Sequence, residues 1–134
     1  MTIPTPPRPL VIGPLSVTDF VRYQGASGDF NPIHHDIEFA RSAGFDAPLA
    51  LGMLQAGMLA TWATNWLGPR NVRRFRVRFE EQVWPGDVLT SVGSVDQVYE
   101  VDGKTLVDVE LVCRRQTGGV AVRGWATFQV NEEV

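Results

Sequence analysis

The side chains most able to carry chemistry lie in one short segment of the chain. Asp29, Asn31, His34, His35 and Asp36 fall within eight positions, and the two histidines are the only ones in the sequence. Carboxylate and imidazole groups bind metal ions or transfer protons, whereas aspartate and asparagine also hold turns. The residue types alone leave open whether this segment binds a metal, takes part in a reaction or is only a surface turn.

Each of these interpretations has its own requirements. The run Gly-Asp-Phe-Asn-Pro at 28–32 is typical of a surface turn in which Asp29 and Asn31 bond to their own backbone. A metal site is disfavoured, because the adjacent His34 and His35 point apart in an extended chain and no cysteine or Glu-x-x-His pair completes the ligand set. A phosphate-binding loop is excluded, because no glycine-rich segment followed by lysine leads into a helix. We therefore expect no bound metal.

The elements before this segment should hold it in place. Ser16 and Asp19 resemble a capping box, so a helix of about two turns is expected from there to Gly25. The proline after Asn31 keeps that residue out of the α conformation. The stretch 28–32 should therefore be irregular and depend on its surroundings.

Two helices are expected after it. A short one covers 37–43, with His35 and Asp36 capping it or lying in solvent. A long one covers 48–67, where apolar residues occupy nearly every side, so it must be buried. About 18 to 20 residues would suffice to cross a bilayer. Two internal glycines, the lack of a basic N-terminal flank and four polar residues favour a central helix of a globular domain instead; the four are Gln55, Thr61, Thr64 and Asn65.

The second half of the chain alternates with a period of two, which predicts strands. Apolar residues alternate with arginines over 74–79, and runs rich in valine follow at 88–99, 106–112 and 120–130. Glycine-containing turns separate these runs as hairpins. With a first strand near 10–15, the sequence predicts an α+β domain in which about five antiparallel strands curl around the long helix.

Length and composition limit the remaining possibilities. The 134 residues are 44% hydrophobic, which fits a single domain over 1–134 that needs no disulfide, and Cys113 has no partner. The net charge of −3 disfavours nucleic acid and anionic membranes as partners. Residues 1–9 contain four prolines and no apolar run, so we expect an extended arm and not a secretory signal, with order beginning near Leu10. These features indicate a cytoplasmic protein.

A longer pattern resembles a known family. The run Ser-Gly-Asp-Phe-Asn-Pro-Ile-His at 27–34 is followed by Gly44-Phe45 and by Gly52-Met53-Leu54 at the start of the long helix. Together with Phe79 and Pro85-Gly86-Asp87, this is similar to the MaoC-like, R-specific enoyl-CoA hydratases over nearly the whole chain. The resemblance implies a hot-dog fold, in which the sheet wraps the long helix.

The resemblance also implies an activity, the addition of water to trans-2-enoyl thioesters of coenzyme A or acyl carrier protein, without a cofactor. Asp29 and His34 match the catalytic pair, and Gly52 matches the glycine whose backbone N–H faces the thioester oxygen. Water must lose a proton as it attacks C3, C2 must gain one, and charge gathers on the thioester oxygen. We expect Asp29 to act on the water and His34 to donate toward C2, although a coupled pair shares its proton.

Other residues have two interpretations each. Asn31 either supports the loop and substrate or is only a turn residue before proline. Met53 either lines an acyl pocket or packs in the core. The arginines at 70–78 either contact coenzyme A or form a solvated strand face. Leu51 departs from the histidine that many family members have before the Gly-Met pair, which changes the polarity of the pocket wall.

Two alternative functions remain. A thioesterase on the same fold would aim Asp29 at the carbonyl carbon and would leave His34 unexplained. A non-catalytic subunit would bind acyl chains or complete a heteromer, which the intact Asp29 and His34 pair disfavours. Exposed sheet edges predict a homodimer or a heterodimer with another hot-dog chain.

Overall fold

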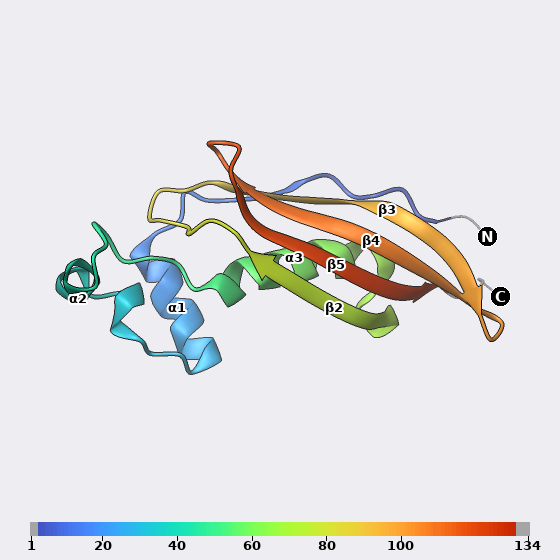
Figure 1. Cartoon of the computed structure of the whole chain (residues 1–134), viewed down its shortest axis with the longest axis horizontal. Helices are drawn as coiled ribbons and strands as arrows, with labels where there is room; N and C mark the ends of the chain where they lie inside the picture. Colours follow the sequence, from blue (N-terminus) through green and yellow to red (C-terminus); the bar gives the residue numbers. More distant parts are fainter. Residues whose placement is uncertain (1–2, 131–134) are drawn as a thin grey trace.

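The fold is one antiparallel sheet curved over one long helix. The computed structural model describes residues 3–130. Five strands in the order β1-β3-β4-β5-β2 form the sheet, and α3 lies along it (Figure 1). This is the hot-dog arrangement that the sequence predicts. Its elements are β1 (Leu10–Ile12), α1 (Val17–Ser27), η1 (Pro32–His34), α2 (Ile37–Ser42), α3 (Gly52–Leu67), η2 (Pro69–Asn71), β2 (Val72–Phe79), β3 (Leu89–Val101), β4 (Lys104–Arg115) and β5 (Val120–Val130).

The three long strands follow the hydrophobic alternation. Asp102 and Gly103, both at positive φ, turn β3 into β4, and Gly118 at φ 89° helps to turn β4 into β5. The hairpin predictions are therefore confirmed. β1 is shorter than the expected 10–15, because Pro14 has no N–H to donate to the sheet.

The core forms where α3 meets the sheet. Leu59 and Ala63 are fully buried, and Trp62 is 3% exposed. The helix is not apolar and buried all round, since Met53 in its first turn is 58% exposed. Its sheet-facing side supplies the burial that stabilises the domain.

The long helix begins at Gly52, which confirms the start that the family resemblance implies, whereas the start at residue 48 expected from the apolar stretch is wrong. The preceding residues use their backbone groups elsewhere: the Leu49 N–H donates to the Ile33 carbonyl at 3.2 Å, and the Ala50 N–H donates to the Val83 carbonyl at 2.8 Å. Leu51 is extended, with φ −76° and ψ 127°. This short strap links the start of α3 to the loop that carries the candidate site.

The N-terminal arm is extended, as predicted, but order begins before Leu10. The indole N–H of Trp62 donates to the Arg8 carbonyl at 3.0 Å, and that of Trp66 donates to the Pro4 carbonyl at 2.7 Å. Buried indoles need such acceptors. The proline-rich arm therefore satisfies two core tryptophans, a contact between residues more than fifty positions apart.

The first helix also differs slightly from its prediction. The Ser16 and Asp19 capping box is present, but α1 continues past Gly25 to Ser27 and ends at Gly28 in the left-handed conformation. These two additional residues bring the end of α1 directly to Asp29. None of the helices in the part described, 3–130, has the length and apolarity needed to cross a membrane.

Candidate active site

Asp29 and Asn31 organise the loop between α1 and α2. The Asn31 N–H donates to Asp29 Oδ1 at 3.2 Å, and the Ile33 N–H donates to Asn31 Oδ1 at 3.1 Å. Both side chains thus make the turn bonds expected of this sequence, and Asn31 caps the short η1 helix. These bonds fix Asp29 Oδ1 and leave Oδ2 facing the next functional group.

That group is His34. Its Nε2 lies 4.0 Å from Asp29 Oδ2, too far for a direct hydrogen bond but close enough for both atoms to contact one small molecule. The His34 side chain is 12% exposed and that of Asp29 is 55% exposed. The carboxylate is therefore open to solvent while the ring is held inside.

A backbone carbonyl sets the tautomer of His34. Its Nδ1 lies 2.7 Å from the Leu49 oxygen, and a carbonyl oxygen can only accept. Nδ1 must therefore carry a proton, so the neutral ring presents the lone pair of Nε2 toward Asp29. In this state His34 is ready to accept a proton at Nε2, and the imidazolium is ready to donate one there.

Gly52 is the first residue of α3, where a backbone N–H has no partner inside the helix. The helix dipole favours negative charge at this end. The glycine also allows a close approach, since a Cβ here would lie 2.8 Å from Cε1 of Phe79. The strap at 49–51 joins this N–H to the His34 loop through the Leu49 bonds already described.

The other residues singled out in the sequence have different surroundings. Asp36 caps α2 by accepting from the Glu38 and Phe39 N–H groups, as expected. Met53 is exposed beside Gly52. Leu51 is 3% exposed, makes no side-chain cap bond and belongs to the hydrophobic core.

Sequence reasoning missed Gln24. It lies on the buried face of α1, is 1% exposed, and bonds to both Asn31 and His35. Its position four residues after the buried Phe20 was the available signal, because helical spacing places it on the same inward face. A glutamine there needs polar partners inside the protein.

The arginines of β2 belong to the outer face of the sheet. Arg76 and Arg78 lie over the ring of Trp125, with guanidinium carbons 4.9 and 5.7 Å from the ring centroid. Arg78 also pairs with Glu80 at 2.6 Å. Those contacts suit a solvated strand face, and a contact with coenzyme A stays a prediction.

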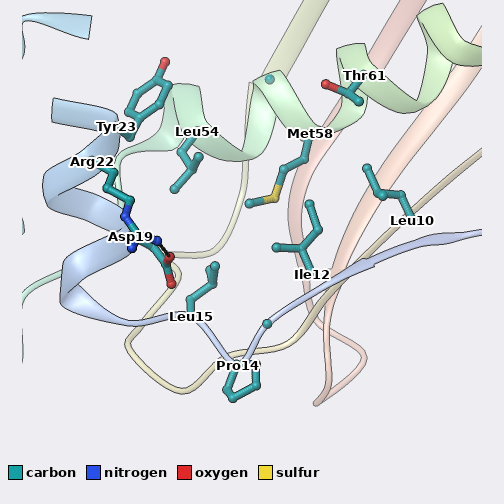
Figure 2. A pocket seen from close by; sticks show the side chains of 12 residues that line it. Leu10, Ile12, Pro14, Leu15, Asp19, Arg22, Tyr23, Leu54, Met58 and Thr61 are labelled. Carbon is teal, nitrogen blue, oxygen red and sulfur yellow. Dashed lines mark ion pairs between the residues drawn. The ribbon is translucent and has the colours of Figure 1, made fainter. Parts of the chain in front are cut away.

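A hollow of about 740 Å³ lies between β1, α1 and α3. Figure 2 shows Leu54 and Met58 of α3 pointing into it across from Ile12, with the Asp19 and Arg22 ion pair at its rim. Asp29, His34 and Gly52 are not among its lining residues. In residues 3–130 no group of three or more histidine, cysteine or acidic side chains is placed to hold a metal ion.

Known relatives share this domain. The chain is 30% identical to the (R)-specific enoyl-CoA hydratase of Rhodospirillum rubrum over 118 residues, which are 87% of this chain and 80% of that protein. It is also 39% identical to the mouse peroxisomal multifunctional enzyme type 2 over 66 residues. The match covers 47% of this chain but only 9% of the length of the mouse protein.

Solved structures agree on the fold. The ChsH1-ChsH2 complex from Mycobacterium tuberculosis contains a chain that superimposes with a TM-score of 0.82 at 21% identity, covering 97% of this chain and 98% of that one. The family model described as MaoC like domain matches residues 2–115. The chain therefore belongs to the MaoC-like dehydratase family.

Proposed function

We propose that this protein adds water reversibly to trans-2-enoyl thioesters and forms (R)-3-hydroxyacyl thioesters. The observation that carries the proposal is the approach of Asp29 Oδ2 to His34 Nε2, 4.0 Å apart, with the imidazole tautomer set by Leu49. This pair lies in a MaoC-like domain, and the Rhodospirillum rubrum relative carries the name of an (R)-specific enoyl-CoA hydratase.

The pair supplies the proton transfers of the reaction. A water molecule between Asp29 and His34 gives up one proton to the pair while its oxygen bonds to C3. The π electrons of the C2–C3 bond move toward the thioester, and C2 then takes a proton from the pair, so the pair ends in its starting state. Because the water molecule contacts both groups, base and acid are roles of the pair and not of either residue alone.

Gly52 supplies the remaining requirement. As C3 is attacked, negative charge develops on the thioester oxygen, and a fixed N–H at a helix start stabilises it without reorganisation. Removing one such donor typically costs about 10²- to 10³-fold in rate. Asn31 holds Asp29 through its own N–H, and the exposed Met53 beside Gly52 is the candidate contact for the acyl chain.

The substrate is an enoyl group carried by coenzyme A or by acyl carrier protein, and the working form is a dimer. The partner is either a second copy of this chain or a different chain, and the two-component ChsH1-ChsH2 complex from Mycobacterium tuberculosis provides a precedent for the second case. The buried, unpaired Cys113 agrees with the predicted cytoplasmic location.

The test is product analysis with crotonyl-CoA and the purified chain. Loss of the enoyl absorbance with a product heavier by one water is the expected result, and the R isomer should form. Release of free coenzyme A would instead identify a thioesterase. Turnover only after a second hot-dog chain is added would show that the active form is a heteromer, and no turnover in either case would contradict the proposal.

A further inference from the structure

A buried glutamine ties the candidate catalytic loop to α1. The Gln24 side chain is 1% exposed, and its Nε2 donates to the Asn31 carbonyl at 3.0 Å. Its Oε1 lies 2.9 Å from Nδ1 of His35. The loop is therefore joined to α1 at two points, one on each side of the short η1 helix.

The chemistry of the partners fixes the direction of both bonds. The Asn31 carbonyl can only accept, so the Gln24 amide nitrogen must face it and the amide oxygen must face His35. His35 therefore carries a proton on Nδ1, in its neutral and in its charged form alike. Protonation of His35 at its other ring nitrogen therefore leaves the hydrogen bond from Nδ1 to Gln24 Oε1 in place.

The two histidines thus anchor the loop to two different elements. His34 donates from Nδ1 to the Leu49 carbonyl in the strap before α3, and His35 donates from Nδ1 to Gln24 in α1. Adjacent side chains that point apart suit this double attachment. These two anchors hold the C-terminal end of the segment from Asp29 to His34, and Asp29 itself is largely exposed.

We propose that Gln24 and His35 form a positioning pair that sets the separation of Asp29 and His34 for hydration. The inference rests on the proposed function. Neither residue touches the reacting atoms in this scheme; they act through the Asn31 backbone, whose N–H also holds Asp29 Oδ1. A displacement of about 1 Å at such a site can lower the rate on the order of 100-fold.

Matched substitutions separate the effect of the two hydrogen bonds from the effect of side-chain size. Gln24→Met keeps the length of the side chain and removes both hydrogen bonds. His35→Asn places an amide nitrogen near the position of Nδ1, whereas His35→Gln moves the donor one bond further out. We expect Gln24→Met and His35→Gln to lower kcat on the order of 10- to 100-fold with little change in KM, and His35→Asn to retain most of kcat.

Imidazole ¹⁵N NMR gives a readout that does not depend on activity, because the chain has only two histidines. Both neutral rings should carry the proton on Nδ1 in the wild type. In Gln24→Met the His35 ring should lose this preference while the His34 ring keeps it. His35 is exposed, so His35→Gln offers a variant that folds even if Gln24→Met does not.

The outcomes distinguish a failure of the positioning role from a failure of the proposed function. An active wild type with unchanged kcat in Gln24→Met and His35→Gln would overturn the positioning role alone. Equal losses in His35→Asn and His35→Gln would also overturn it, because the restored donor would then have no effect. A wild type without hydratase activity would overturn the proposed function itself, whatever the NMR spectra show.

Discussion

Asp29 and Asp87 both follow a glycine in a turn, and they differ in every other respect. The Asp29 side chain is 55% exposed, and Oδ1 accepts one backbone N–H. The Asp87 side chain is 5% exposed and accepts from the Trp84 N–H, from Arg115 and from Gln116. A carboxylate with both oxygens engaged holds structure, whereas one with an oxygen free beside an imidazole can react.

The ionisation of Asp87 reflects its role. Burial alone would raise the pKa of its carboxyl group, but the hydrogen bonds from Arg115, Gln116 and the Trp84 N–H outweigh this and lower the pKa. The same ion pair raises the pKa of Arg115, chiefly through its hydrogen bond to Asp87. The ion pair therefore stabilises the charged forms of both Asp87 and Arg115 in this turn.

The largest expected effect is on turnover by a variant of Asp29. Asp29→Asn keeps the size of the side chain and removes the carboxylate from the proposed pair, so kcat for crotonyl-CoA should fall about 10²- to 10⁴-fold. Its free energy of unfolding should change by no more than about 0.5 kcal/mol, because the position is exposed. Steady-state kinetics and urea unfolding on the same preparation check both. A large loss of stability with normal kcat would instead show that Asp29, like Asp87, has a structural role.

The next largest effect should follow from removing the backbone N–H of Gly52. Gly52→Pro removes the N–H at a helix position that tolerates proline, and Leu51 already has the extended conformation that proline requires before it. We expect kcat to fall about 10²- to 10³-fold. Gly52→Ala is the control, since it adds a Cβ near Phe79 but keeps the N–H. Equal losses in the two variants would attribute the effect to crowding.

Asp87→Asn should show the opposite pattern from Asp29→Asn. It removes one of the two carboxylates that pair with Arg115, while Glu81 still pairs with Arg115 at 3.2 Å, so the free energy of unfolding should fall by about 2 kcal/mol. The kcat of the protein that remains folded should stay close to the wild-type value. Chemical denaturation with activity measured below the transition tests this, and unchanged stability would contradict the structural role.

A smaller effect concerns pH. Because the pKa of Asp87 is lower in the folded protein than its ordinary value of 3.8, its charge stabilises the fold above that value. This contribution disappears as the pH falls through the folded pKa, below about 4. The difference in unfolding free energy between wild type and Asp87→Asn should therefore narrow between pH 6 and pH 3. A constant difference would show that ionisation of Asp87 is not involved.

The smallest effect lies far from the site. Trp66→Phe removes the hydrogen bond to the Pro4 carbonyl and should lower the free energy of unfolding by about 1 kcal/mol, plus the loss of packing. The kcat should not change. Thermal unfolding of the variant measures the contribution of the arm, and an unaltered midpoint would mean that this bond contributes nothing.

The sequence predicts what depends on local pattern. The hairpins, the capping box of α1 and the aspartate cap of α2 follow from short-range rules, and the resemblance indicates the fold. Three features depend on distant contacts: the extended strap at 49–51, the arm bound to Trp62 and the network around Gln24. In each case, backbone groups or buried polar atoms find partners that periodicity does not show.

The most direct test of the central claim is a double-mutant cycle on Asp29→Asn and His34→Ala. If both groups act on one water molecule, removing either abolishes the shared step, and the double variant should be about as slow as the slower single variant. Losses that multiply, so that the double variant is slower by the product of the two single effects, would contradict a shared water and with it the proposed mechanism.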